Sequence, residues 1–240
     1  MKFEDFSLRV SYETDGKEVV VSDGDGVISV EKIAEGDRFV VRLDAAKKVR
    51  LISARMVASR EFAPEERFFG GGYQSWSLTR EYSPKDRQKG LRNVAHLPVV
   101  RTFAAASGDY DFARYGRKLY HSHGYTYIRR GSATELFGSL DESFAFTLFY
   151  LDAEENVFAV VKDVEGAEIE GSVTLFDLFR AEGTYDEVFD RYFALYPLKA
   201  PRRGIKRLAG YTSWYNYYQN VTEKIVMRDL EGMYGAAGSA

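Results

Sequence analysis

The sequence predicts a mainly β fold, a large antiparallel β-sandwich, on three observations. Near the N-terminus, apolar residues fall at every second position: Phe6, Leu8, Val10 and Tyr12. This period is that of a strand with one buried face. Short extended runs separated by turn-rich pieces continue through most of the 240 residues, and a clear helical period begins only near Thr184. Many strands at short spacing are typical of a sandwich.

The remaining strands follow in order. Valine-rich runs at 19–21 and 27–30 flank residues 22–26, whose Asp-Gly pairs supply the positive φ of a hairpin turn. A calcium loop is the alternative interpretation of Asp23 and Asp25, but its other ligands do not follow at the usual spacing. Further extended runs are predicted at 38–43, 49–56, 126–129, 144–151, 157–161 and 173–179. Because the run 144–151 is apolar on both sides, it predicts a central core strand.

A helix is predicted to begin at Thr184, which can cap it together with Glu187 three residues on. Its apolar stripe has the spacing of one helical face: Tyr185, Val188, Phe189, Tyr192, Phe193 and Tyr196. Pro197 ends it. Residues 198–207 are basic and favour a linker between two structural units; a phosphate-binding patch is the alternative, but no aromatic residue interleaves the charges.

A strand followed by a helix is predicted after this linker. Residues 208–213 suit a short buried strand, and Asn220 can cap a helix with Glu223 at the third position. The apolar face of that helix is formed by Ile225, Val226, Leu230 and Met233. The predicted division is a sandwich at 1–183, a capping helix and linker at 184–207, the strand–helix unit at 208–234 and a tail at 235–240.

Composition excludes several classes of protein. With 33 basic and 36 acidic side chains the formal net charge is -3, so no nucleic-acid partner is expected. Cysteine is absent, which excludes disulfides, a thiolate nucleophile and cysteine-ligated metals. No apolar stretch is long enough to cross a bilayer, and the first residues lack the pattern of a secretory signal. We therefore expect a cytoplasmic protein without a membrane partner.

Two aromatic clusters, at 68–77 and 210–218, each hold one of the two tryptophans. In the first, three glycines at 70–72 precede Tyr73 and Trp76, and a tight backbone beside bulky rings suits stacking on the apolar face of a sugar. Gln74 and Ser75 would add hydrogen bonds to hydroxyl groups. The alternative is that Tyr73 and Trp76 close one end of the sandwich as core residues.

Metal and acid–base chemistry find little support in the sequence. The histidines, His96, His121 and His123, lack the spacing of a zinc site, so no metal or other cofactor is expected. His123 could donate to a sugar hydroxyl or be an ordinary satisfied histidine. The acidic candidates are scattered: Asp109, Asp111, Asp141 and Glu142. No spacing argument places two of them at the separation that glycoside hydrolysis requires.

Taken together, Gln74-Ser75-Trp76 and Gly210-Tyr211-Thr212-Ser213-Trp214-Tyr215 resemble motifs of the glycoside hydrolase family 36 α-galactosidases. The resemblance covers residues 68–233 and implies a galactose-mutarotase-like supersandwich followed by the first strand–helix unit of a (β/α)8 barrel. It also implies hydrolysis of terminal α-D-galactosides of the melibiose and raffinose type, with retention. The expected partner is a small-molecule carbohydrate.

The resemblance further implies which residues meet the sugar. Trp214 and Tyr215 would lie at the C-terminal end of the first barrel strand, where barrel active sites form, and Trp76 would overhang the same pocket beside Tyr73. The two catalytic aspartates of the family belong to later barrel strands. No catalytic residue is therefore expected within these 240 residues, and the chain alone is expected to be inactive.

Two other functions are compatible with the same residues. One is a non-catalytic carbohydrate-binding or assembly module, whose sandwich would make the protein a homo-oligomer. The other stays within the resemblance, because the family includes raffinose synthases, which transfer galactose instead of hydrolysing its linkage. Transfer and hydrolysis differ in the acceptor subsite, which the two motifs do not reach.

Overall fold

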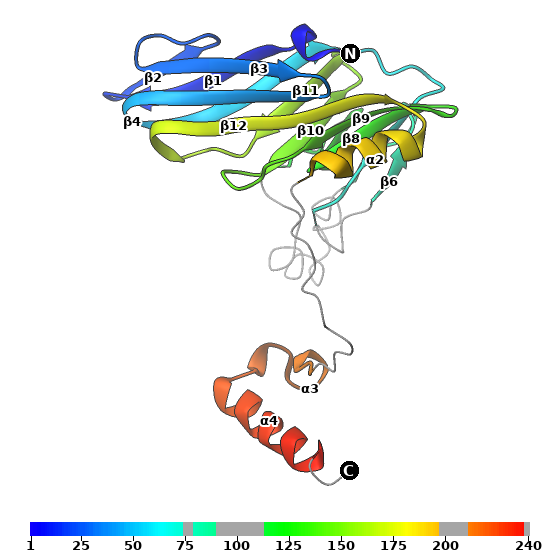
Figure 1. The fold of residues 1–240 in the computed structure, drawn as a ribbon. Helices are drawn as coiled ribbons and strands as arrows, with labels where there is room; N and C mark the ends of the chain where they lie inside the picture. The colour runs from blue at the N-terminus through cyan, green and yellow to red at the C-terminus, as the bar shows by residue number, and fades with distance from the viewer. Residues whose placement is uncertain (74–78, 90–112, 197–210, 238–240) are drawn as a thin grey trace. The chain divides into compact units, whose positions relative to one another are not determined.

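The computed structural model describes residues 1–73, 79–89, 113–196 and 211–237 (Figure 1). The chain divides into two compact units, Met1–Leu198 (unit 1) and Lys199–Ala240 (unit 2). Within the described ranges, no helix is both long and apolar enough to cross a membrane. Each unit is described by itself.

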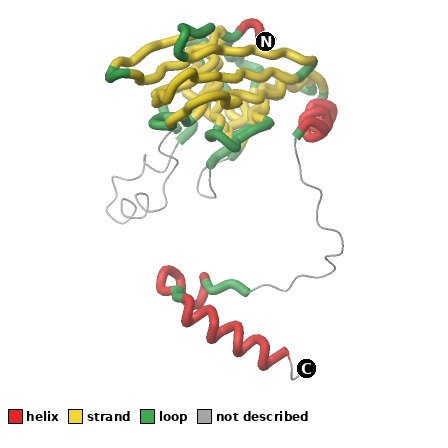
Figure 2. Tube along the Cα trace, turned by 60° about the vertical axis from the view of Figure 1, so that its left-hand side comes forward, coloured by secondary structure: helices red, strands yellow, loops and turns green. Residues whose placement is uncertain are grey.

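Unit 1 is built on one continuous antiparallel sheet that curves back on itself (Figures 1 and 2). A 3-10 turn, η1 (Phe3–Asp5), precedes its strands. These are β1 (Ser7–Thr14), β2 (Lys17–Val21), β3 (Ile28–Glu35), β4 (Arg38–Ser59), β5 (Arg67–Gly70), β6 (Arg80–Tyr82), β7 (Leu119–His123), β8 (Tyr125–Arg130), β9 (Ala133–Ser139), β10 (Thr147–Asp152), β11 (Val157–Lys162) and β12 (Glu168–Gly183). The mainly β prediction is confirmed.

Strand β4 belongs to both layers of this sheet. Its first half pairs with β3 and β12, and its second half pairs with β1 and β11. One layer therefore has the order β3-β4-β12-β9-β8-β5-β6, and the other has the order β2-β1-β4-β11-β10-β7. A strand that passes from one layer to the other joins them without a loop.

The extended runs predicted at 38–43 and 49–56 are both confirmed as strand, but their separation is wrong, because β4 runs through both. Apart from Val40, its buried residues fall at odd positions from Phe39 to Leu51 and at even positions from Ala54 to Ala58. The change of parity coincides with a register shift in the pairing with β1, opposite Ser11 and Tyr12. One extra residue in the strand turns the following side chains over. The bulge keeps the apolar face of β4 on the core in both layers.

The main core fills the space between the layers. The alternation predicted for the first strand is confirmed, since Leu8, Val10 and Tyr12 are buried. The hairpin predicted around 22–26 does not form, because β2 pairs with β1 and β3 pairs with β4. These residues instead form a turn, in which Asp25 accepts hydrogen bonds from the Tyr12 hydroxyl at 2.5 Å and from the Val27 and Ile28 N–H groups at 3.0 Å. These bonds match the plain-turn interpretation of this segment.

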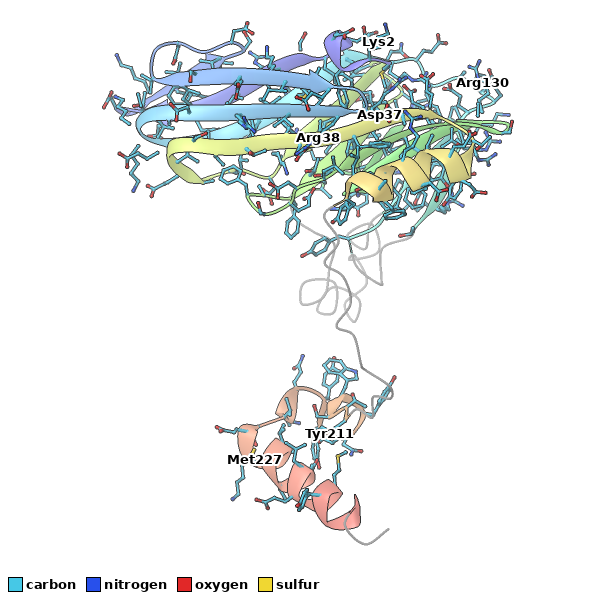
Figure 3. All side chains as sticks on the ribbon, viewed as in Figure 1. Lys2, Asp37, Arg38, Arg130, Tyr211 and Met227 are labelled. Atoms are coloured by element: carbon cyan, nitrogen blue, oxygen red, sulfur yellow. The ribbon has the colours of Figure 1, made fainter. Side chains whose placement is uncertain are left out.

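Helix α2 (Tyr185–Leu195) packs against β9 and β12 (Figure 1). The predicted capping box is present, with Glu187 Oε2 accepting from the Thr184 N–H at 2.9 Å. The predicted apolar stripe is wider than the buried one, because only Val188 and Tyr192 are buried. A second, smaller core forms where these two side chains meet the sheet. Arg191 of this helix is ion-paired with Asp37, which is labelled in Figure 3.

Unit 2 is helical in its described part, residues 211–237, where the fold differs from the predicted strand–helix unit. Residues 211–213 form no strand, and 208–210 lie outside the described residues. The helices are α3 (Trp214–Tyr217), η3 (Tyr218–Asn220) and α4 (Glu223–Ala237). A strand needs a neighbour for its backbone hydrogen bonds, and the described part of this unit supplies none. Residues 211–213 therefore do not supply the strand of the predicted barrel unit, and the barrel itself stays a prediction.

Helix α4 begins later than Asn220 predicts. Asn220 ends η3, and the Thr222 Oγ1 accepts from the Ile225 N–H at 3.3 Å. Of the predicted apolar face, Ile225 and Val226 are partly buried, whereas Leu230 and Met233 are exposed. Tyr211 and Met227, labelled in Figure 3, belong to this unit, and the Tyr211 hydroxyl donates to Asp229 at 2.5 Å.

Candidate functional site

The glycine-rich segment after β5 lies directly against β7. The Gly71 N–H donates to Ser122 Oγ at 2.9 Å, and the His123 N–H donates to the Gly71 carbonyl at 3.2 Å. A Cβ added at Gly70 would come within 2.7 Å of the Tyr82 ring, and one at Gly71 within 3.0 Å of Ser122 Oγ. Glycine is therefore required here for the close approach of two backbones.

This contact presents Tyr73 on the surface. Its ring centroid lies 5.4 Å from that of His123 and 6.1 Å from that of Phe146, the latter with the rings nearly perpendicular. Tyr73 and Phe146 are each 48% exposed. Two accessible aromatic surfaces beside an imidazole can meet the apolar C–H face of a sugar and its hydroxyl groups.

The two histidines of β7 add imidazole rings beside Tyr73 and Phe146. His121 and His123 lie on the same side of the strand, with ring centroids 5.7 Å apart. The His121 ring also meets Tyr115 at 4.8 Å and Tyr150 at 5.8 Å. We call the six side chains the aromatic cluster: Tyr73, Tyr115, His121, His123, Phe146 and Tyr150. The sequence singled out both histidines but gave no indication of Tyr115 and Tyr150.

Phe146 corrects the strand prediction for 144–151. Strand β10 begins at Thr147, and Phe146 lies in the loop before it. The rest of the prediction is confirmed, because β10 lies between β11 and β7 and Thr147 to Leu151 are buried. Aromatic residues at 144 and 146 continue the strand pattern, so alternation alone placed Phe146 in the core rather than at the surface.

A buried lysine secures the loop that carries Phe146. Lys162 is 1% exposed, and its Nζ donates to the carbonyls of Asp141 and Ala145, both at 2.9 Å. Burial lowers the pKa of Lys162. Two carbonyl acceptors compensate part of the cost of burying the ammonium group. The sequence contains a signal for this role, since Lys162 continues the inward parity of Phe158 and Val160 in β11.

The acidic residues near this loop serve the backbone. Asp141 Oδ1 accepts from the Ser143 N–H at 2.8 Å, and Glu142 Oε2 accepts from the Thr147 N–H at 2.6 Å. The other two scattered acids of the sequence analysis, Asp109 and Asp111, lie outside the described residues. Within the described ranges, no three metal-ligating side chains gather around a common point; His96 lies beyond them.

The predicted site residues have different outcomes. Trp76, with its neighbours Gln74 and Ser75, lies outside the described residues. Trp214 and Tyr215 lie in unit 2, 52% and 91% exposed, and the Trp214 ring lies 4.4 Å from that of Tyr218. The two units are described separately, so the predicted meeting of Trp76 with Trp214 stays a prediction.

The comparisons with known proteins add no name to this site. No protein-family model matches the chain, and no curated protein matches it. The aromatic cluster presents the half-exposed rings of Tyr73 and Phe146, together with phenol groups and the imidazole of His123. The glycines at 70 and 71 allow the backbone before Tyr73 to pack closely against its neighbours. Such a surface suits recognition of a polyhydroxylated ligand.

Proposed function

We propose that the aromatic cluster binds a carbohydrate, and that the sandwich is the N-terminal part of a retaining α-galactosidase acting on terminal α-galactosides. One observation carries the proposal. Tyr73 is held on the surface against His123 and Phe146 by a glycine-dependent backbone contact, directly before Gln74-Ser75-Trp76 in the sequence. The core alternative predicts buried rings, whereas Tyr73 and Phe146 are each 48% exposed.

The chemistry of the cluster agrees with a sugar ligand. The apolar face of galactose stacks on an aromatic ring, and its hydroxyl groups need donors and acceptors nearby. Tyr73 offers both a ring face and a phenol, and His123 adds imidazole nitrogens. The loop anchored by Lys162 keeps Phe146 in place, so part of the surface is preorganised before the ligand arrives.

Binding is tested by titrating the full chain with galactose and with melibiose, using calorimetry and tryptophan fluorescence. We expect both sugars to bind, and Tyr73→Ala to weaken binding about 5- to 10-fold, because one aromatic contact contributes about 1 kcal/mol. Tyr185→Ala is the matched control: Tyr185 is also 48% exposed but lies on α2. Equal affinities of the two variants, or no binding by the unaltered chain, would refute a sugar site at Tyr73.

A measurement of turnover distinguishes the α-galactosidase proposal from the binding-module alternative. The family resemblance assigns the catalytic aspartates to barrel strands outside these 240 residues, so we expect binding without hydrolysis of an aryl α-galactoside. A rate above that of a Trp76→Ala, Trp214→Ala double variant would contradict this expectation. The binding-module alternative gains support if a chain ending at Tyr196 keeps full sugar affinity, because the described residues of both apolar cores of unit 1 extend no further than Tyr196.

A further inference from the structure

Two arginines face each other directly across strands β1 and β4. Arg9 and Arg55 are register partners in the antiparallel pair, and both side chains are exposed. No hydrogen bond or ion pair joins either guanidinium to another side chain in the described part of the chain. Like charges directly opposite each other in a sheet are destabilising. The fold therefore carries an uncompensated positive pair at this position.

The other like-charged register partners among the described strands are each neutralised. Glu13 and Glu18 face each other, but Arg50 lies 3.4 Å from Glu13. Arg67 and Arg129 face each other, but Glu81 binds Arg129 at 2.6 Å.

The third neutralised pair is Glu135 and Glu182, which Arg180 joins. Arg9 and Arg55 thus differ from every other like-charged pair that the described strands contain. Within the described residues, no side chain supplies a compensating charge at this position.

The surroundings of the pair form a place for such a charge. A groove of about 420 Å³ contains Arg9 and Arg55, and a second groove of about 480 Å³ continues from Arg55 to Arg114. Apolar side chains lie beside Arg55 in both grooves: Val57, on the same strand, lines the smaller groove, and Val161, the register partner of Arg55 in β11, lines the larger one. Grooves of this size accommodate a small ligand.

Two carboxylates also line the larger groove, and neither neutralises the arginines. Asp152 Oδ1 is occupied by the N–H groups of Glu154 and Glu155, both at 3.0 Å. Glu165 lines the groove with an exposed side chain and makes no ion pair within the described ranges. The guanidinium groups therefore remain available to an incoming ligand.

We propose that Arg9 and Arg55 bind the oxyanion group, a phosphate or a carboxylate, of a small ligand whose body lies in the adjoining grooves. The planar guanidinium forms two parallel hydrogen bonds with such a group, and two arginines side by side match its charge. The overall charge of -3 means that this positive pair is a local feature rather than part of a basic surface.

Arg9 and Arg55 lie apart from the exposed part of the aromatic cluster, although Tyr150 of the cluster lines the larger groove. Arg55, Val161, Leu148 and His123 follow one another in register across β4, β11, β10 and β7. Three strand spacings place Arg55 about 14 Å from His123 along the sheet. The two arginines are therefore distinct from Tyr73 and His123, the residues that carry the sugar proposal.

The test is calorimetric titration of the full chain at low ionic strength with galactose 6-phosphate, galacturonate, inorganic phosphate and uncharged galactose. We expect the anions to bind, and we expect Arg55→Gln or Arg9→Gln to lower their affinity by at least about tenfold. Added salt should weaken binding further. Equal binding of phosphate and galactose 6-phosphate would mean that the oxyanion alone is recognised, whereas tighter binding of the sugar phosphate would add a contribution from the grooves.

Arg42→Gln is the matched control, because Arg42 lies exposed in β4 but is ion-paired with Glu31. It should leave anion affinity unchanged, and so should Tyr73→Ala, which tests only the sugar site. Without ligand, Arg55→Gln should raise Tm by about 1–3 °C as the repulsion is removed. Anion binding equal in Arg42→Gln and Arg55→Gln, no binding of any anion, or a lowered Tm would overturn the proposal.

Discussion

Gly138 shows how one residue without a side chain determines where a helix packs. It lies in β9, and the ring of Tyr192 from α2 rests on its backbone, with the Tyr192 Cζ 2.7 Å from the position of an added Cβ. The Tyr192 hydroxyl donates to the Ser139 carbonyl at 2.6 Å in a buried hydrogen bond. Ring packing and hydrogen bond together hold the helix on the sheet, and both need the space that glycine leaves.

We predict that Gly138→Ala lowers the free energy of unfolding by about 1–3 kcal/mol, because the methyl group would displace the ring. Urea denaturation followed by circular dichroism measures this loss. Repeating the substitution in a Tyr192→Leu background provides the control, since the two changes should then couple. Strictly additive losses would show that the ring and the glycine do not act together.

At the scale of elements, α2 is the part of unit 1 whose start is best explained. Glu187 Oε2 accepts from both the N–H and the hydroxyl of Thr184, at 2.9 and 2.8 Å. The inner face of α2 then packs against the small core through Val188 and Tyr192. Local capping decides where the helix begins, and packing decides which of its faces is covered.

Thr184→Ala should reduce the free energy of unfolding by about 1 kcal/mol, the usual cost of losing an N-cap hydroxyl. Thr184→Ser keeps the hydroxyl and should stay close to the unaltered protein. Chemical denaturation of the three proteins at neutral pH makes the comparison. If serine cost as much as alanine, the threonine methyl group rather than the cap would be responsible.

At the scale of the whole molecule, buried tyrosines tie the sheet to its loops and make stability depend on alkaline pH. The Tyr120 hydroxyl of β7 donates to the carbonyls of Ser83 and Asp86, at 3.1 and 2.8 Å. Burial raises the pKa of Tyr120 from 10.0 to about 12. Above pH 10 the unfolded chain releases this proton while the folded chain retains it, so stability falls as pH rises toward 12.

We therefore expect the urea midpoint to hold steady up to about pH 10, the ordinary tyrosine pKa, and to fall beyond it. Tyr120→Phe loses two hydrogen bonds and should be less stable at pH 8, but its midpoint should fall less steeply above pH 10. Midpoints at pH 8, 9, 10 and 11 compare the two proteins. Parallel curves would assign the alkaline loss to other groups.

Sequence patterns predicted the parts of the fold that depend on neighbouring residues. Alternation at Leu8, Val10 and Tyr12 identified the buried face of β1, and the spacing of Thr184 and Glu187 identified the start of α2. The same reasoning failed at 211–213, because an apolar run has the pattern of a strand whether or not a partner strand is present. Of the run predicted at 208–213, residues 211–213 are described and form no strand.

The candidate site was predictable only in part. Tyr73 and His123 were singled out from an aromatic, glycine-rich context, and the structure places their rings 5.4 Å apart. Phe146 was assigned to the core because the alternation of β10 extends beyond the strand. Contacts between segments far apart in the chain, such as Gly71 with Ser122, leave no periodic trace in the sequence.

By itself, the sequence determined the strand-rich character of the chain, the capped helix after it and the aromatic composition of the site, because these follow from local periodicity and from the conformations that each residue type allows. Only the tertiary structure decided that β4 serves both layers, that Gly138 lies beneath Tyr192 and that Arg9 faces Arg55. Period-two alternation says which face of a strand is buried. It does not say which strand lies beside it, and pairing across the sheet brings charges, rings and glycines together.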